Sequence, residues 1–177
     1  MPYFGNLTDP WIHLEKQNFK FSSAHMTVFP DGTKESLHGH NYSVELSIEL
    51  KQPSIQEMVP FSFFKRSIQE ICQEWDEKVL LAGKCPYLKI KNFDLREIEF
   101  LLCEKRYILP SEDVVLLSID NVTVEALTQE FCRQFLGKFE FTFLSKKISS
   151  VEVRVNEMLG QGASCLWQGS MLSSDVL

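Results

Sequence analysis

The sequence lacks the features that mark membrane, secreted and nucleic-acid-binding proteins. No segment approaches the ~20 apolar residues that a membrane-spanning helix needs, and MPYFGNLTDPW at the N-terminus has neither the basic start nor the apolar run of a secretory signal. The formal net charge is −6, and Lys and Arg form no dense cluster, which argues against a nucleic-acid partner. We therefore expect a cytoplasmic protein with neither a membrane nor a nucleic acid as its partner.

The cysteines also lack the pattern of a disulfide framework or a structural zinc site. There are five of them, an odd number, at positions 72, 85, 103, 132 and 165, and no CxxC pair occurs. The simplest interpretation is a reduced setting in which most of them are small core residues.

What is present fits one globular domain over residues 1–177. Hydrophobic residues make up 44% of the chain and charged residues 24%, an ordinary balance for such a domain. Residues 1–11 read as an N-terminal arm. Residues 82–120 mix short apolar runs with turn residues, and they predict a hairpin or an irregular excursion inserted into the domain.

Four segments have the pattern of strands. The clearest is 38–50, where polar and apolar residues alternate over thirteen positions. Residues 12–25 precede it across the turn-rich loop FPDGTKES. Two late strands, 151–157 and 163–167, are joined through the glycines of LGQG.

Two helices are expected between these strand pairs. Pro60 opens the first, and possible cap residues at Asp120–Thr123 open the second. Apolar residues at three- and four-residue steps form one stripe on each helix. The stripes are Phe64, Ile68, Ile71, Trp75 and Val79 on the first helix and Val124, Leu127, Phe131 and Phe135 on the second.

The order strand, strand, helix, helix, strand, strand predicts the fold class. Hairpins at both ends with helices between them give an α+β fold, in which two helices pack on one face of an antiparallel four-stranded sheet.

Three of the four histidines fit one metal site. His38 and His40 are two residues apart on a strand and so project from the same face, and His25 ends the strand before it. Three neutral imidazoles with an open fourth position are typical of catalytic zinc. An HxH pair can also be two hydrogen-bonded histidines without a metal, although an unpartnered imidazole on an apolar face is costly. The pattern favours one divalent metal, Zn²⁺ in the first place.

Glu157 follows three valines in register on the strand 151–157 and so shares their apolar face. A carboxylate there either ends the strand in water or accepts a ligand. A partly buried carboxylate accepts two parallel N–H donors well, and guanidinium and the 2-amino-4-oxopyrimidine edge of a pterin or guanine both offer such a pair. Both interpretations of Glu157 are open from the strand pattern.

The motifs as a set resemble the 6-pyruvoyltetrahydropterin synthase family, which includes the 6-carboxytetrahydropterin synthases. FSSAH at 21–25 and LHGHNYSVELSIE at 37–49 carry the resemblance. WDEKVLL at 75–81, Thr123 and Glu125 at the start of the second helix, and Glu157 follow in the order typical of the family. The resemblance covers roughly residues 18–168 and is weakest over 82–120.

The resemblance implies a tunnelling fold, the T-fold, in which three subunits close a barrel and two trimers stack into a homohexamer with active sites between subunits. It also implies zinc on His25, His38 and His40, a pterin held by Glu157 with Thr123 and Glu125 nearby, and 7,8-dihydroneopterin triphosphate as the substrate class.

The sequence departs from the ordinary family pattern at two places. Ordinary members carry a catalytic cysteine in the loop before HGH, and FPDGTKESL contains none. Members also usually have Asp-His where this chain has Asp76 and Glu77, and the only remaining histidine, His13, lies near the N-terminus. Asp76 and Glu77 are therefore the carboxylates that the family pattern places at the catalytic position.

Glu35, three residues before His38, resembles the glutamate of a variant class of the family. That class cleaves the substrate side chain to give 6-hydroxymethyl-7,8-dihydropterin, a precursor in folate biosynthesis. Glu35 can also be an ordinary solvated loop carboxylate. The leading hypothesis is a zinc-dependent lyase with Glu35 as general base. The alternatives are a 6-pyruvoyltetrahydropterin synthase on the route to tetrahydrobiopterin, a non-catalytic zinc- and pterin-binding protein, and a purely structural histidine cluster.

Overall fold

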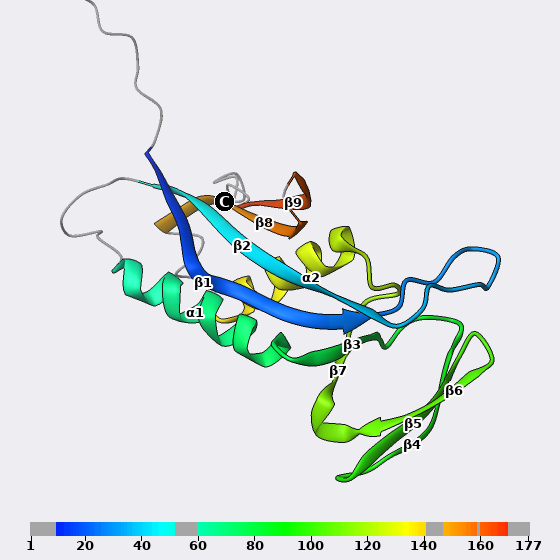
Figure 1. The fold of residues 1–177 in the computed structure, drawn as a ribbon. Helices are drawn as coiled ribbons and strands as arrows, with labels where there is room; N and C mark the ends of the chain where they lie inside the picture. Colours follow the sequence, from blue (N-terminus) through cyan, green and yellow to red (C-terminus); the bar gives the residue numbers. More distant parts are fainter. Residues whose placement is uncertain (1–9, 52–59, 141–146, 159, 170–177) are drawn as a thin grey trace, which may run out of the picture.

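The computed structural model describes residues 10–51, 60–140, 147–158 and 160–169 (Figure 1). The first hairpin is β1 (Trp11–His25) with β2 (His38–Leu50), and the last is β8 (Ile148–Met158) with β9 (Gln161–Gln168). Two helices, α1 (Phe61–Trp75) and α2 (Val124–Gly137), lie between them in the sequence. The remaining elements are β3 (Lys78–Ala82), β4 (Leu88–Phe93), β5 (Glu97–Leu102), β6 (Lys105–Pro110), the short 3-10 helix η2 (Ser111–Asp113) and β7 (Val114–Leu117).

The main sheet has six strands in the order β7-β3-β1-β2-β8-β9, so the expectation of a four-stranded antiparallel sheet is wrong. The four predicted strands do form its antiparallel centre and edge, but β3 adds to β1 in parallel and β7 adds to β3 in parallel. Parallel neighbours need long crossover connections, which local alternation cannot reveal. The short apolar runs KVLLA and VVLL therefore become strands only because the chain brings them alongside β1 and β3.

The first helix ends earlier than its apolar stripe predicts. Asp76 is extended, and Glu77 has a positive φ of 57°, so the chain reverses after Trp75. Val79, the last residue of the predicted stripe, therefore lies on β3 and pairs with Ala24 of β1. The predicted start of the second helix is confirmed, since Thr123 is the N-cap of α2 and its side chain accepts a hydrogen bond from the Ala126 N–H at 3.3 Å.

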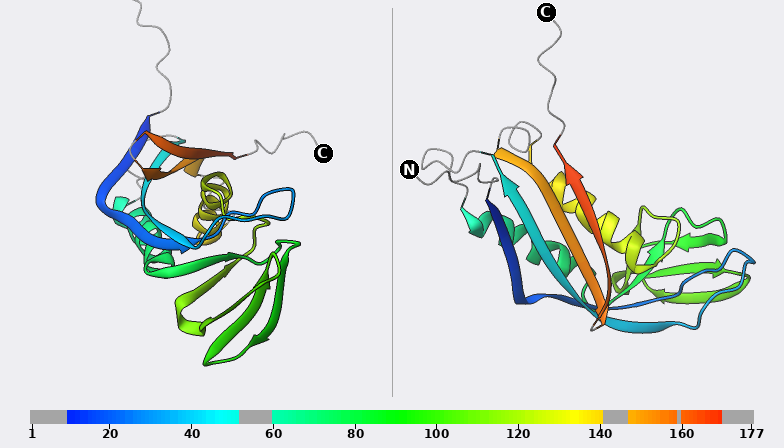
Figure 2. Two further views of the ribbon diagram at one scale, coloured as in Figure 1. Left: turned by 45° about the vertical axis from the view of Figure 1, so that its right-hand side comes forward. Right: turned by 90° about the horizontal axis from the view of Figure 1, so that it is seen from above.

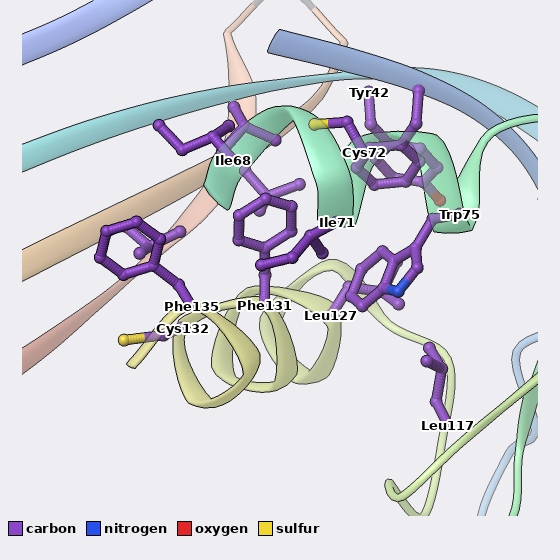
Figure 3. Packing of buried hydrophobic residues seen from close by; sticks show 14 of the residues in the cluster. Tyr42, Ile68, Ile71, Cys72, Trp75, Leu117, Leu127, Phe131, Cys132 and Phe135 are labelled. Carbon is purple, nitrogen blue, oxygen red and sulfur yellow. The ribbon is translucent and has the colours of Figure 1, made fainter. Parts of the chain in front are cut away.

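Both helices cover one face of the main sheet (Figure 2), as the two stripes predict. Their buried side chains meet those of the strands in one core, and Figure 3 shows Trp75 of α1 near Leu127 and Phe131 of α2. The Trp75 and Phe131 rings meet edge to face with centroids 5.5 Å apart. Cys72 and Cys132 are buried in this core, and burial raises the pKa of each thiol to about 12, as fits small core residues.

Residues 82–120 are more regular than expected. They contain a separate three-stranded antiparallel sheet, β4-β5-β6, followed by η2 and β7. Ile98, Phe100 and Leu102 of β5 are buried and belong to the same hydrophobic core as the side chains of the main sheet and the helices. It projects from the main body beside the connection between β1 and β2 (Figures 1 and 2).

The predicted arm, residues 1–11, is described only at its end. Trp11 is already the first residue of β1, so the arm is shorter than expected, and residues 1–9 lie outside the described part of the chain. Among the helices of the described residues, none combines the length and the apolar character needed to cross a membrane.

Candidate metal and substrate site

The pairing of β1 with β2 brings His25, His38 and His40 together. His25 and His38 are direct partners at the end of the hairpin that the 26–37 loop connects, and His40 lies two residues further along the same face of β2. One ring nitrogen from each lies within 4.8 Å of the others. Ring centroids are 4.7 Å apart for His25 and His38 and 4.9 Å apart for His38 and His40. The spacing of three imidazole nitrogens around one point fits a metal ion.

The outer nitrogens of two of these rings are already engaged by backbone carbonyls. His25 Nδ1 lies 3.0 Å from the Val122 oxygen, and His38 Nδ1 lies 2.8 Å from the Ser36 oxygen. A ring whose Nδ1–H donates to a carbonyl is the tautomer that leaves Nε2 free to bind a metal. Sequence patterns could not have identified Val122, because its contribution is a backbone atom.

His25 tests whether this cluster suits a metal. Its Nε2 is buried and has no hydrogen-bond partner among the described residues. Burial lowers the pKa of His25, which keeps the ring in the neutral form that ligates metals. A buried, unsatisfied acceptor is costly unless something binds it, so the donor set of three neutral imidazoles fits a divalent ion such as zinc.

Glu157 lies beside the cluster, and only 10% of its side chain is exposed. Its Oε1 is 3.4 Å from His40 Nε2 and accepts a hydrogen bond from the Tyr42 hydroxyl at 3.3 Å. Its Oε2 accepts a hydrogen bond from Gln161 Nε2 at 2.9 Å. Burial, together with the charge of Glu157, raises the pKa of Tyr42, so this hydroxyl stays a donor. The carboxylate is thus held in place by two side chains rather than solvated at a strand end.

Neither Tyr42 nor Gln161 is among the predicted site residues. Tyr42 belongs to the HGHNY motif, so its place next to His40 on the same strand face was a usable signal. Gln161 had no such signal, because it meets Glu157 only through the tight β8–β9 turn.

Glu35 reaches the cluster from the loop between β1 and β2. Its Oε2 is 3.8 Å from His38 Nε2, and the side chains of Glu35 and His38 are 40% and 39% exposed. The backbone N–H of Glu35 donates to the Thr27 carbonyl oxygen at 2.9 Å, and this bond fixes the position of the Glu35 backbone. Glu35 is therefore a carboxylate on the outer side of the histidines, opposite in exposure to Glu157.

Asp76 and Glu77 lie at the end of α1, away from direct contact with the histidines. Asp76 Oδ1 accepts from the Ser22 N–H at 2.7 Å, so this carboxylate ties α1 to β1. Both residues line a cavity of about 620 Å³ between β1, β2 and α1. Glu77 also lines a second, more open hollow of about 460 Å³ that His40 reaches. Among the described contacts, neither carboxylate pairs with a histidine.

Thr123 and Glu125 lie at the start of α2. The Thr123 oxygen is occupied as the N-cap, and the exposed Glu125 interacts with the Thr123 side chain and the first-turn backbone, which lowers the pKa of its carboxyl. The link between this segment and the histidine cluster is Val122, the residue before Thr123, because the Val122 carbonyl oxygen lies within hydrogen-bonding distance of His25 Nδ1. The segment before α2 therefore contacts the site through a backbone carbonyl group.

Comparisons with known proteins point to one family. The family model for 6-pyruvoyl tetrahydropterin synthase matches residues 14–166. A Methanocaldococcus jannaschii protein named as a candidate 6-carboxy-5,6,7,8-tetrahydropterin synthase is 33% identical over 147 residues, which cover 81% of this chain and 87% of that protein. The crystal structure of 6-pyruvoyl tetrahydropterin synthase from Plasmodium vivax has a TM-score of 0.80 at 25% identity and covers 90% of this chain and 98% of its own. In two further structures of that synthase, a glutamate described as a catalytic residue is replaced by alanine or cysteine.

Proposed function

Because this chain belongs to the 6-pyruvoyl tetrahydropterin synthase family, we propose that it is a zinc-dependent lyase that converts 7,8-dihydroneopterin triphosphate to 6-hydroxymethyl-7,8-dihydropterin. One observation carries the choice of reaction. The loop that precedes the histidine pair contains no cysteine, and its Glu35 carboxylate lies 3.8 Å from His38 Nε2. A glutamate is also a catalytic residue of the P. vivax synthase, so a carboxylate can act in this fold.

The proposed ligands of the metal are His25, His38 and His40. The unpartnered, buried Nε2 of His25 and the carbonyl contacts to the other ring nitrogens support this set. When bound, zinc supplies a Lewis acid that lowers the pKa of hydroxyl groups on the substrate side chain.

Glu157 is the proposed anchor of the pterin ring. Its two oxygens are oriented by Tyr42 and Gln161, which leaves each oxygen further acceptor capacity for the paired N–H groups of the 2-amino-4-oxopyrimidine edge. Burial strengthens such charge-assisted bonds because little water competes for them.

Glu35 is the proposed general base. It takes the proton from the C2′ hydroxyl, the C2′–O bond becomes a carbonyl, and the C1′–C2′ bond breaks. The electron pair moves to C1′ and into the conjugated pterin ring, and Glu35 then returns its proton to C1′, which completes the hydroxymethyl group and regenerates the base. The other product is the aldehyde that carries the triphosphate. A carboxylate suits removal of this hydroxyl proton, whereas a thiolate suits the carbon-bound protons of the pyruvoyl-forming reaction.

Incubation of the purified protein with 7,8-dihydroneopterin triphosphate, followed by mass identification of the pterin, tests the proposal. Release of 6-hydroxymethyl-7,8-dihydropterin is the expected result. Formation of 6-pyruvoyltetrahydropterin would show that the protein catalyses the ordinary family reaction instead. Tight pterin binding without turnover would identify a non-catalytic binding protein instead.

A further inference from the structure

The loop that carries Glu35, residues 26–37, is internally ordered. We call it the base loop. Val28 and Lys34 form an antiparallel bridge, and the Phe29 N–H donates to the Thr33 oxygen at 2.8 Å. Gly32 turns the chain with a φ of 81°, a conformation that glycine adopts at little cost. The base loop is thus a small hairpin, and its placement depends on what holds it from outside.

One end of the base loop is held by the segment before α2. The Asn121 side chain bonds both backbone groups of Val28, donating to its oxygen at 2.9 Å and accepting from its N–H at 3.0 Å. The Thr27 hydroxyl donates to the Val122 oxygen at 3.2 Å. These contacts fix the start of the loop but do not touch its tip or Glu35.

The other contacts of the base loop come from the β4-β5-β6 sheet and its approach. The Tyr87 hydroxyl donates to the Pro30 oxygen at 3.2 Å. The Tyr87 ring also lies so close to Gly32 that a Cβ there would be 3.1 Å from Cε1. The Cys103 thiol lies 4.0 Å from the Thr33 oxygen as a weak donor. In the right-hand view of Figure 2 the loop runs alongside this sheet.

Of the contacts between the base loop and this sheet, the one nearest in sequence to Glu35 is between Lys34 and Tyr107 of β6. The Lys34 ammonium lies 5.2 Å from the centroid of the Tyr107 ring, within the range of a cation–π interaction. The same ammonium donates to the backbone carbonyl oxygen of Glu35 at 2.9 Å. Tyr107 is itself fixed, because its ring stacks on the fully buried Phe100 with centroids 5.1 Å apart.

We infer that the β4-β5-β6 sheet is a platform that positions the base loop, and that Tyr107 and Tyr87 act as positioning residues for Glu35. The inference rests on the proposed role of Glu35 as base. It assigns a function to residues 82–120, for which the sequence predicted only a hairpin or an irregular excursion. A general base must stay within hydrogen-bonding reach of one proton, and a displacement of about 1 Å can lower a rate by as much as 10²-fold. An exposed loop needs such external support to keep that geometry.

A double-mutant cycle on the platform contact tests the inference. Lys34→Met keeps the chain length but removes the ammonium, and Tyr107→Leu removes the ring. We expect each to lower kcat by roughly 10- to 100-fold, with KM and zinc content nearly unchanged. The double variant should be no slower than Lys34→Met alone, because Lys34→Met already removes the contact that Tyr107→Leu breaks, together with the bond from the ammonium to the Glu35 backbone oxygen.

Two variants of β6 serve as controls for effects on stability alone. Tyr107→Phe keeps the ring and should retain near-normal kcat. Arg106→Gln breaks the exposed ion pair with Glu99, which is 2.8 Å long and does not touch the base loop, and should also leave kcat unchanged. Hydrogen exchange gives a readout without substrate: the Glu35 N–H, bonded to Thr27, should exchange faster in Tyr107→Leu than in Tyr107→Phe.

The outcomes separate this inference from the proposed function. If Glu35→Gln abolishes turnover while Lys34→Met and Tyr107→Leu keep normal kcat, the platform inference fails and the role of Glu35 stands. Additive effects of the two variants would also overturn it, since they would act at separate places. If Glu35→Gln itself retains normal turnover, the proposed base is wrong whatever the platform variants do.

Discussion

Two carboxylates approach the histidine cluster from opposite environments, and the roles that we propose for them differ for that reason. Glu157 is nearly buried and oriented by Tyr42 and Gln161, which suits a fixed acceptor for a ligand. The Glu35 side chain lies on a loop and is 40% exposed, which suits a group that exchanges protons with substrate and solvent. The histidines between them present a buried, unpartnered nitrogen at His25.

At this scale the first prediction concerns the proposed base. Glu35→Gln should lower turnover by ~10²–10⁴, the usual worth of a positioned base. Zinc content and pterin binding should persist, because neither the ligands nor Glu157 is changed. Steady-state kinetics with product identification measures this, and Glu112→Gln, an exposed carboxylate in η2, is the matched control. Near-normal release of 6-hydroxymethyl-7,8-dihydropterin would move attention to Asp76 and Glu77.

The metal ligands give the second prediction. The purified protein should carry about one zinc per chain, and His38→Ala should lose most of it because one of three protein ligands is gone. Elemental analysis by mass spectrometry measures the content. His13→Ala is the control, since His13 is exposed and bonds Ser47 at 2.8 Å. Full zinc retention in a His38→Ala, His40→Ala double variant would contradict the assigned site.

The anchor gives the third prediction. Glu157→Gln keeps the shape but removes the charge and replaces one acceptor with a donor, so pterin binding should weaken by roughly 2–4 kcal/mol. Calorimetric titration with the substrate's pterin ring measures the change. Glu152→Gln lies on the same strand and should leave affinity unchanged. Unaltered affinity in Glu157→Gln would remove this residue from the site.

At the scale of elements, the site depends on where secondary structures end. His25 ends β1, His38 begins β2, Glu157 lies near the end of β8, and Val122 precedes α2. The ends of strands and helices carry chemistry because their side chains and free backbone groups are not used up by the element itself. The β4-β5-β6 sheet then supports the one loop among these that carries the proposed base.

Thr123 allows a test at this scale, because its helix cap and its predicted substrate role have different signatures. Thr123→Ala should destabilise the protein by about 1 kcal/mol through loss of the bond to the Ala126 N–H. Thr123→Ser should restore most of that stability. Denaturant unfolding measures the first effect. A rise in KM in Thr123→Ala that Thr123→Ser also restores would show that the hydroxyl serves the pterin as well as the helix.

At the scale of the whole molecule, the main sheet has two open edges. β7 and β9 are its outer strands, and β9 carries Leu166 with its side chain 55% exposed. Open strand edges favour pairing with further chains. In the proposed homohexamer, a dimer of trimers with active sites between subunits, neighbouring subunits would pair at these edges.

The hexamer is the prediction at this scale. Sedimentation or light scattering should give a mass near six times the 20.5 kDa of one chain. Leu166→Asp should shift the mass toward smaller species, because a carboxylate on an edge strand opposes pairing. The exposed Leu95→Asp, in the β4–β5 turn, is the control and should leave the mass unchanged. A wild-type mass of one chain would refute the hexamer.

The sequence by itself determined the elements whose patterns are local. Alternation over 38–50 specified β2 and the shared face of His38 and His40, and the helical stripes specified α1 and α2. The four strands of the predicted sheet exist and pair antiparallel as expected. The motifs also identified the family correctly. These successes share one physical reason: periodicity of 2 or 3.6 residues is set by backbone geometry and needs no distant partner.

Only the tertiary structure decided the features that depend on distant segments. Val79 continued a helical stripe in the sequence, yet the reversal at Glu77 made it part of a parallel strand beside β1. The hydrogen bond between His25 and the Val122 carbonyl likewise joins residues 97 positions apart, whose local patterns carry no sign of each other. Parallel pairing and backbone hydrogen bonds depend on which segments the chain brings together, and side-chain patterns do not encode them.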